Sequence, residues 1–361
     1  MKKRIGLIVA LVVVLLFAIS ACSKPADTGA KTENAPATTE QPASTSDGAG
    51  GPGSYNVRLG IVQPGPEFYY QTFTDRIAAA AEYSGMNVTA LLSEYSTEKE
   101  VANIEDLIAQ GVDAITVFSL ASETAQIDAQ KCEEAGMPLF LTNSALGDGP
   151  ADIVSMIGNS FYEMGEQDGK WVVENQDILP KDLKILEIQG QLGQGIAEGI
   201  SDGFADQIAL IDGAQIVHKQ TANWIRTEAI AITEDSLMSS LDFNMIFVHN
   251  EDMCAGVVKV LKENDVLNNG VVVITQNGSD DGIAMIKAGE VLATCANPPS
   301  FVGGDVVVQM LRYFDGVDVP RVYDSPVFMI DAANVNSPDL VTWDQKWAIS
   351  RVDEYFAGTY K

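Results

Sequence analysis

Basic residues and histidine are scarce in this chain of 361 residues. It contains 22 Lys and Arg against 50 Asp and Glu, which gives a formal net charge of −28 at pH 7. A surface of this sign repels phosphate backbones, so the composition argues against nucleic-acid binding. The two histidines, His218 and His249, lie in no motif with a nucleophile or further metal ligands. We therefore expect neither a histidine-based catalytic centre nor a bound metal ion.

Cysteine is scarce as well, with four in the whole chain. Beyond Cys22 the number is odd, and the spacing matches no disulfide framework. We expect Cys132, Cys254 and Cys295 to be small buried apolar side chains that form no disulfide.

The N-terminus has the order of residues that an export signal has. Lys2, Lys3 and Arg4 precede an apolar stretch, residues 5–19, that is short for a bilayer span of about 20 residues. The stretch ends in AISAC, which resembles a bacterial lipobox, whose cysteine is acylated after cleavage. We predict a lipoprotein signal peptide over residues 1–21, with Cys22 as the lipid attachment point. An ordinary signal peptide or an uncleaved anchor is the alternative.

Residues 22–54 are predicted to form a lipid-anchored flexible linker. Ala, Thr, Ser, Pro and Gly dominate this segment, which holds too little apolar surface to fold. A flexible chain of this length has an end-to-end distance of roughly 30 Å. We expect the folded part to lie outside the cytoplasm, at the cell surface or periplasmic face, with the lipid as its only contact with the membrane.

Beyond residue 54, short apolar runs alternate with segments long enough to be helices. The first series of runs is VRLGIV, NVTALL, DAITVF and MPLFLT, and the second is KILEIQ, AQIVHK, NMIFVH, GVVVIT and VLATCA. Residues 97–111 are typical of the intervening helices, because Ile104 and Leu107 share one face and Gly111 ends the pattern. Continuous apolar strands alternating with helices predict parallel sheets covered on both faces. Two such series predict two doubly wound lobes.

Polar residues gather where these strands end, which is where parallel sheets bind ligands. Asparagine recurs there, as Asn143, Asn223, Asn250, Asn277 and Asn297. An amide both donates and accepts hydrogen bonds, as a pair of neighbouring hydroxyl groups does. A turn or a helix cap explains any one of them equally well. Five at one edge of the sheets favour ligand binding.

Several segments taken together resemble the ribose/galactose-type periplasmic sugar-binding proteins, the solute receptors of ABC importers. These segments are NIEDLIAQGVDAITV, IGNSFYEMGEQDGKWV, ANWIRTEA, FVHNEDMCAG and QNGSDDGIAMIKAGEVLAT. The resemblance implies an α/β chain with the type I periplasmic-binding fold, in which two doubly wound parallel-sheet lobes are joined by a three-strand hinge. It assigns residues 55–158 and about 298–326 to an N-terminal lobe. Residues 159–297 and about 327–361 are assigned to a C-terminal lobe.

The resemblance also implies a set of ligand-binding residues. They are Glu67, Tyr69, Tyr70, Asn143, Glu198, Trp224, Asn250, Asn277 and Asn297. Asn143 and Ser144 stand where the family usually has Asp-Arg, Glu198 where an Arg is frequent, and Asn277 where Asp is usual. Because Asp–Arg pairs grip hydroxyl groups through charge-assisted hydrogen bonds, these departures leave a site of amides, aromatics and a few carboxylates. We expect a neutral polyhydroxy ligand, or one with an amine facing Glu67 or Glu198.

The resemblance implies a monomeric binding protein that delivers its ligand to an ABC permease and performs no catalysis. A receptor of the same fold that feeds a sensor kinase or chemoreceptor is the main alternative, and an anchored enzyme is a more remote one. The segment GQLGQGIAEG lacks the third glycine of a dinucleotide loop, and NGSDDG is no nucleophile elbow. We therefore expect no cofactor. In the C-terminal tail, Trp343 and Trp347 are four residues apart and are expected to pack on a lobe rather than to bind ligand.

Overall fold

A computed structural model describes residues 52–193 and 195–360 of the chain. The predicted signal peptide, Cys22 and nearly all of the predicted linker lie outside these residues. Within the described part, each helix is too short or too polar to cross a membrane.

The first sheet belongs to the N-terminal lobe and consists of six parallel strands in the order β11-β5-β4-β3-β1-β2. They are β1 (Arg58–Gln63), β2 (Asn87–Leu92), β3 (Ala114–Val117), β4 (Leu139–Thr142), β5 (Ser155–Gly158) and β11 (Val322–Asp324). The central strands β3 and β4 are buried along their whole length. This explains their continuous apolar sequence, since both faces of the sheet are covered.

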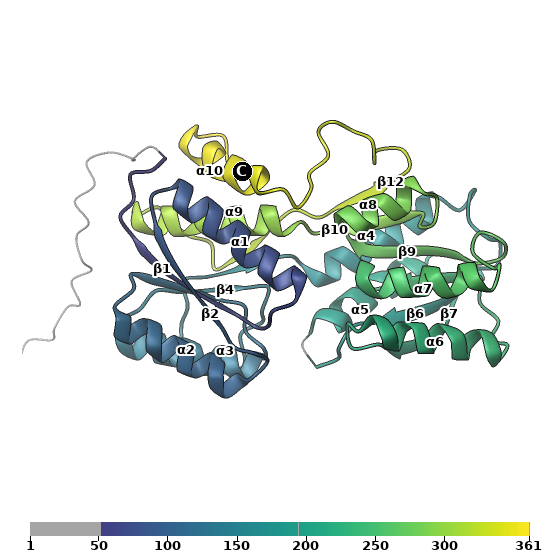
Figure 1. Ribbon diagram of the computed structural model, residues 1–361, viewed down its shortest axis with the longest axis horizontal. Coiled ribbons are helices and arrows are strands. Elements are labelled where there is room, and N and C mark those ends of the chain that lie inside the picture. Colours follow the sequence, from purple (N-terminus) through teal and green to yellow (C-terminus); the bar gives the residue numbers. More distant parts are fainter. Residues whose placement is uncertain (1–51, 194, 361) are drawn as a thin grey trace, which may run out of the picture. The chain divides into compact units, whose positions relative to one another are not determined.

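Helices cover this sheet on two sides (Figure 1). One side carries α1 (Phe68–Tyr83), α9 (Pro299–Phe314) and α10 (Gln345–Phe356), and the other carries α2 (Thr97–Gln110) and α3 (Ser122–Ala135). Helix α2 begins and ends as the sequence predicts. The Ser96 side chain accepts a hydrogen bond from the Lys99 backbone N–H, and Gly111 adopts the left-handed conformation (φ 69°) that commonly ends a helix.

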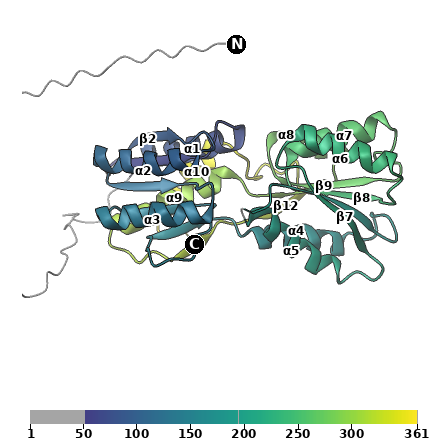
Figure 2. The ribbon, with the colours of Figure 1, turned by 90° about the horizontal axis from the view of Figure 1, so that it is seen from below.

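The second sheet belongs to the C-terminal lobe and has the order β12-β10-β9-β8-β6-β7. Its strands are β6 (Lys184–Gln189), β7 (Gln215–Thr221), β8 (Met245–Val248), β9 (Val272–Asn277), β10 (Ala293–Ala296) and β12 (Phe328–Asp331). All pairs are parallel except β10 with β12. Figure 2 shows α6 (Arg226–Met238), α7 (Glu251–Glu263) and α8 (Asp280–Lys287) on one face, and α4 (Phe161–Glu174) and α5 (Ile196–Ile208) on the other.

The chain passes three times between the two sheets. It leaves β5 of the first sheet for α4, leaves β10 of the second sheet for α9, and leaves β11 of the first sheet for β12 of the second. These crossings give the two-lobed α/β architecture of the type I periplasmic-binding fold, which confirms the predicted fold class. Strands β5, β11 and β12 were not predicted individually, because they are short and only partly buried.

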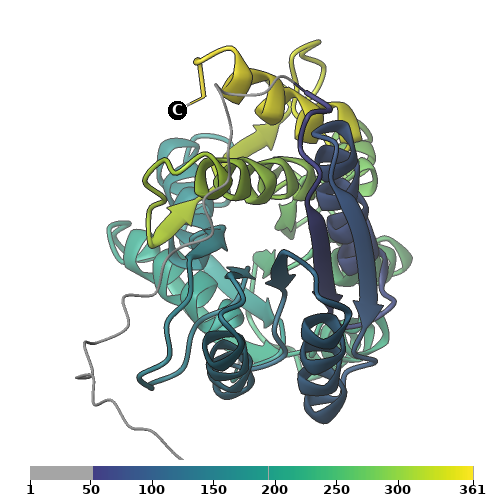
Figure 3. The same ribbon diagram turned by 90° about the vertical axis from the view of Figure 1, so that its left-hand side faces the viewer.

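The C-terminal helix lies elsewhere than predicted. We expected residues 327–361 in the C-terminal lobe, and β12 does join the second sheet. Helix α10, however, packs against α1 and α9 of the N-terminal lobe (Figure 3, yellow). Its buried residues Ala348 and Val352 belong to the same apolar cluster as Ile77 of α1. The apolar face of α10 is buried against α1 and α9, although the helix follows β12 in the sequence. The tail therefore returns to the N-terminal lobe.

The three cysteines in the described part are free and buried, as predicted. Cys132, Cys254 and Cys295 are at most 1% exposed. Burial raises the pKa of each thiol, so these cysteines remain neutral small apolar side chains.

Candidate functional site

A cleft of about 1490 Å³ is lined by residues from both lobes. This volume exceeds the roughly 300–1000 Å³ of typical small-molecule pockets. Most of the lining follows the carboxyl ends of strands, which is the expected binding edge of doubly wound sheets. Eight of the nine predicted ligand-binding residues line the cleft, namely Glu67, Tyr69, Tyr70, Asn143, Trp224, Asn250, Asn277 and Asn297.

The ninth predicted residue, Glu198, is not among the described residues of the cleft lining. It lies in the first turn of α5, where its Oε1 accepts a hydrogen bond from the Gly193 backbone N–H at 2.6 Å. Glu198 Oε1 therefore helps to hold the loop before α5, and the ligand contact predicted for this residue stays a prediction.

Aromatic side chains form the N-terminal-lobe wall, because α1 begins with Phe68, Tyr69 and Tyr70 after a four-residue loop that follows β1. The Tyr70 ring meets the Phe118 ring edge-on, with 5.1 Å between their centroids. Tyr69 and Tyr70 are likewise nearly perpendicular to each other. Burial raises the pKa of Tyr70 to about 12, and the nearby Glu67 adds to the shift. Burial raises the pKa of Tyr69 as well, so both hydroxyls stay protonated near neutral pH and can donate hydrogen bonds.

The opposite wall carries Trp224, on the turn between β7 and α6. Asn223 and Trp224 both have positive φ, 52° and 65°. Asn adopts this conformation comparatively readily, whereas it is an outlier for a bulky residue such as Trp. The indole lies so close to Gly190 that a Cβ there would overlap the ring atoms Cη2 and Cζ2. Gly190 is thus required for the indole to occupy its place in the cleft.

Asparagine side chains link the strand ends to each other. Asn143 Nδ2 donates to the Tyr69 hydroxyl at 3.4 Å, and Asn143 Oδ1 accepts from the Asn159 backbone N–H at 3.0 Å. Asn277 Nδ2 donates to Asn297 Oδ1 at 3.1 Å. These amides are oriented by the protein while they line the cleft, which is how a preformed hydroxyl-binding site is built.

Asn250 is also a structural residue, because its Oδ1 caps α7 through the Met253 backbone N–H at 2.8 Å. The neighbouring Glu251 is buried and accepts three hydrogen bonds of 2.8 Å, from the Gly278 and Ser279 backbone N–H groups and from Thr294 Oγ1. Burial raises the pKa of Glu251 and these donors lower it, with a net value of about 7. Glu251 fixes the loop that follows Asn277.

Sequence reasoning missed His249, which lines the cleft and is buried. Its Nε2 lies 3.0 Å from Glu187 Oε1, and its Nδ1 accepts from the Gly190 backbone N–H at 3.4 Å. Lys219 Nζ lies 3.0 Å from Glu187 Oε2. Because β6, β7 and β8 are neighbours, this charged network lies within the sheet and holds the strand end on which Trp224 packs. The sequence pattern showed a lone histidine, and only the strand order reveals its partners.

Trp343 packs on the N-terminal lobe, as expected, and its side chain also lines the cleft. Its Nε1 donates to the Asn277 carbonyl at 3.2 Å, and its ring stacks on Phe68 with 5.9 Å between centroids. Helix α10 begins at Gln345, so Trp343 precedes the helix and does not share a face with Trp347. Trp347 instead packs edge-on against Phe301.

The described side chains offer binding groups more than reactive ones. No three His, Cys, Asp or Glu residues of the described chain are grouped so as to hold a metal ion. Glu187 and His249 are both engaged in the buried network rather than paired with a nucleophile. Aromatic faces, oriented amides and hydroxyl donors are instead the groups that hold polar ring compounds.

Comparisons with known proteins agree with this geometry. The periplasmic binding protein domain family matches residues 61–317. The ribose import binding protein RbsB of Bacillus subtilis is 25% identical over 306 residues, which are 84% of this chain and 90% of that protein. A Mycobacterium smegmatis protein in complex with β-D-fucofuranose has a similar structure, with a TM-score of 0.72 and 23% identity, covering 82% of this chain and 97% of that one. The fructose-binding periplasmic domain of a hybrid two-component system has a TM-score of 0.70 and 18% identity, covering 84% and 98%.

Proposed function

Because the chain belongs to the periplasmic binding protein family, we propose that it captures a sugar, polyol or related polyhydroxy ligand in the cleft and delivers it to an ABC permease. The likeness to a ribose import binding protein over most of both chains supports this class of ligand and partner. The relatives compared are binding proteins rather than enzymes, and the chain is proposed to act without chemistry on its ligand.

One observation carries the proposal. Aromatic rings and oriented amides from the carboxyl ends of both sheets line the same cleft. Aromatic faces pack on the C–H faces of a ring, and amides exchange hydrogen bonds with its hydroxyls. A ligand that touches both lobes favours the arrangement in which both sets of contacts are made. The permease is proposed to recognise that arrangement.

Binding is tested by thermal-shift screening of the purified protein against sugars, polyols, amino sugars and nucleosides, followed by titration calorimetry. A ligand at a hundred times its Kd stabilises the folded state by about 2.7 kcal/mol. Trp224→Ala is expected to abolish the shift, whereas Trp347→Ala, which removes a tryptophan outside the cleft lining, retains it. Binding that survives Trp224→Ala unchanged would show that the site is misplaced. Small-angle scattering should show a smaller radius of gyration with ligand.

Anchoring through Cys22 is part of the same proposal. Replacing Cys22 by Ser is expected to move the protein from the membrane fraction to the soluble extracytoplasmic fraction and to abolish labelling with a radioactive fatty acid. Unchanged membrane association of the variant would contradict a lipid anchor. The protein is proposed to work as a monomer, which scattering of the same samples tests.

A sensing role is the second candidate, because the same fold occurs in the periplasmic domain of a hybrid two-component system. The two roles differ in what is lost when the protein is absent. Deletion of an import receptor abolishes uptake of the radiolabelled ligand, even when the permease is expressed independently. Deletion of a sensor leaves that uptake intact and abolishes the transcriptional response to the ligand.

A further inference from the structure

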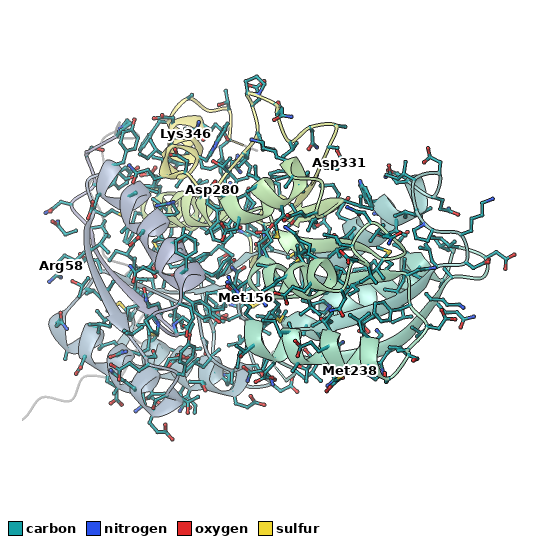
Figure 4. The ribbon with its side chains drawn as sticks, turned by 45° about the vertical axis from the view of Figure 1, so that its right-hand side comes forward. Arg58, Met156, Met238, Asp280, Asp331 and Lys346 are labelled. Atoms are coloured by element: carbon teal, nitrogen blue, oxygen red, sulfur yellow. The ribbon has the colours of Figure 1, made fainter. Side chains whose placement is uncertain are left out.

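The two lobes repeat one strand order, so each strand of one sheet has a counterpart in the other. Strands β2 and β7 lie at one edge of their sheets, beside β1 and β6. Figure 4 labels Arg58 at the start of β1 and Met238 at the end of α6, the helix that follows β7. The three crossings between the lobes use the strands at the opposite edges, which are β5 and β11 in the first sheet and β10 and β12 in the second. The segments after β2 and β7 therefore follow the strands farthest from the crossings.

An aromatic residue occupies the same position after each of these edge strands. Tyr95 is the third residue after β2, and Trp224 is the third residue after β7. Both have positive φ and both follow a residue with positive φ, with values of 52° and 58° for Glu94 and Tyr95 and of 52° and 65° for Asn223 and Trp224. The next helix begins two residues later in both lobes. The two aromatic residues are thus equivalent in the two lobes, and both line the cleft.

The backbone before the two aromatics is held in the same way. Ser93, directly after β2, donates its N–H to the Gln63 carbonyl at 2.9 Å. Ala222, directly after β7, donates its N–H to the Gln189 carbonyl at 2.8 Å. Gln63 and Gln189 are the last residues of β1 and β6. The equivalence of the two loops therefore extends from their backbone conformation to their hydrogen bonds.

Each aromatic ring also lies over a glycine that follows the neighbouring strand. A Cβ on Gly65 would lie 2.0 Å from Cζ and 2.1 Å from the hydroxyl oxygen of Tyr95. A Cβ on Gly190 would overlap the Trp224 indole in the same way. A side chain at either glycine would displace the ring, so glycine at both positions allows the two aromatics to occupy equivalent places.

Packing within the lobe does not account for the position of Tyr95. The residue is 49% exposed, and its ring meets the Tyr70 ring edge-on with 6.3 Å between centroids. Tyr95 is a member of none of the four apolar clusters of the described chain, whereas Trp224 packs against two of them. Positive φ is an outlier for so bulky a side chain. A large aromatic held in this conformation at the cleft, outside the core, is available to a ligand.

We propose that Tyr95 is a ligand-binding residue and the N-terminal-lobe counterpart of Trp224, so that one of these rings packs on the ligand from each lobe. This inference rests on the proposed function, because it adds a contact to the same site. Aromatic faces pack on C–H groups, and two rings from opposite lobes require a C–H face for each of them. A cyclic compound such as a pyranose, a furanose or a cyclitol offers such faces in a fixed arrangement, whereas an open-chain polyol does not.

Matched pairs of cyclic and open-chain compounds test the class of ligand. Titration calorimetry at pH 7 compares D-ribose, D-glucose and D-galactose with their alditols, and myo-inositol with D-glucitol. The cyclic compound that binds best is expected to bind about tenfold or more tightly than its open-chain partner, a difference of about 1.4 kcal/mol. Equal affinity within that pair would contradict a ligand held between two aromatic faces.

Variants of Tyr95 test the contact itself with the preferred cyclic compound. Tyr95→Ala is expected to weaken binding about tenfold or more without lowering the melting temperature of the ligand-free protein, because the ring lies outside the apolar clusters. Tyr95→Phe keeps the ring and should keep most of the affinity. Tyr83→Ala is the matched control, since Tyr83 is 36% exposed and lies outside the cleft lining. Its affinity should equal that of wild type.

Gly65→Ala provides an independent test, because it displaces the ring without removing it. The substitution should weaken binding in wild type and have little further effect in Tyr95→Ala, since contacting residues are not additive. If Tyr95→Ala binds with wild-type affinity, or if Gly65→Ala has the same effect with and without the Tyr95 ring, the inference is overturned while the proposed function stands. If none of the cyclic compounds binds to wild type, the proposed function fails and the inference fails with it.

Discussion

Glu187 Oε1 lies 3.0 Å from His249 Nε2, and both side chains are buried beneath the cleft. Burial alone would raise the pKa of Glu187. Hydrogen bonds from His249 and Ser201, with the charge of Lys219, outweigh it and lower that pKa to about 2. A carboxyl whose pKa is lowered in the folded state stabilises the fold at pH values above its ordinary pKa of 4.5. That stabilisation is lost as the pH falls through that value towards 2.

Replacing Glu187 by Gln removes the carboxylate that accepts from His249 Nε2 and pairs with Lys219. A hydrogen bond to a charged group contributes about 1.5–3 kcal/mol, so we expect a loss of this order at pH 7 by urea unfolding. Stability of the variant should also vary less than that of wild type between pH 4.5 and 2. Asp242→Asn is the control. The ion pair of Asp242 with Lys184 is exposed, and such a pair contributes at most about 1 kcal/mol to stability. Parallel pH profiles for wild type and E187Q would contradict the account.

Glu251 should show the opposite pH dependence. Burial is the largest influence and leaves its pKa at about 7, above the ordinary value of 4.5. A raised carboxyl pKa means that ionisation is disfavoured in the folded state, so stability is lost as the pH rises from about 4.5 to 7. Glu251→Gln cannot ionise. The variant places an amide N–H₂ opposite a backbone N–H that donates to a carboxyl oxygen in wild type. Loss of that hydrogen bond leaves a buried donor unsatisfied, which costs about 1–3 kcal/mol.

The expected result is that E251Q is destabilised at pH 5, and that its deficit relative to wild type shrinks at pH 8.5. Urea unfolding at the two pH values measures this difference. A deficit that is equal at both would show that Glu251 ionises in the folded protein as readily as in water.

Gly190 and Trp224 should be coupled energetically, because a Cβ at residue 190 overlaps the indole atoms Cη2, Cζ2 and Cε2. Gly190→Ala is expected to displace the indole and to weaken ligand binding about tenfold or more, with folding retained. Phe lacks the overlapping part of the ring, so adding Gly190→Ala to Trp224→Phe should weaken binding much less than adding it to wild type. Calorimetry of the four proteins gives the coupling energy, and contacting residues typically show 0.5–3 kcal/mol. Additive effects would mean that the two residues do not interact.

The sequence predicted those features that depend on local pattern. Apolar runs located the central strands, and Gly111 located the end of α2, since each depends on burial or backbone conformation at neighbouring residues. Strand ends likewise pointed to the five asparagines, all of which line the cleft, because parallel strands bring their carboxyl ends to one edge. The aromatic residues and Glu67 came from the family resemblance. The side-chain contacts within the loops and helices that follow the strands were not predictable in this way. Glu198 lies in the first turn of α5, where its Oε1 accepts from the Gly193 backbone N–H, and it is not among the described residues of the cleft lining.

Contacts between residues far apart in the sequence account for the remaining differences between the predicted and the observed structure. His249 is unremarkable in sequence, and its role depends on Glu187, which lies 62 residues away on a neighbouring strand. Helix α10 is amphipathic. Such a pattern predicts that one face of the helix is buried, but it does not predict which lobe buries that face. The position of Trp343 follows from the return of the tail to the N-terminal lobe, so this aromatic of the cleft was missed for the same reason.

Trp343 should contribute to binding by two separable contacts. Its Nε1–H bonds to the Asn277 carbonyl at 3.2 Å, and its ring packs on Phe68 and Tyr69. Trp343→Phe keeps much of the packing and loses one hydrogen bond, worth about 0.5–1.5 kcal/mol. Trp343→Ala also loses the ring, for which core truncations cost about 3–5 kcal/mol. We therefore expect a small decrease in thermal stability and ligand affinity for the first variant and a large one for the second.

Comparison with Trp347→Ala distinguishes an effect on ligand binding in the cleft from an effect on packing within the lobe. Trp347 packs on Phe301 outside the cleft lining, so its loss should lower the melting temperature and leave affinity unchanged. If Trp343→Ala lowers stability to the same extent but also leaves ligand affinity unchanged, then Trp343 serves packing alone. In that case the wall formed by Phe68 and Tyr69 binds ligand without support from the tail.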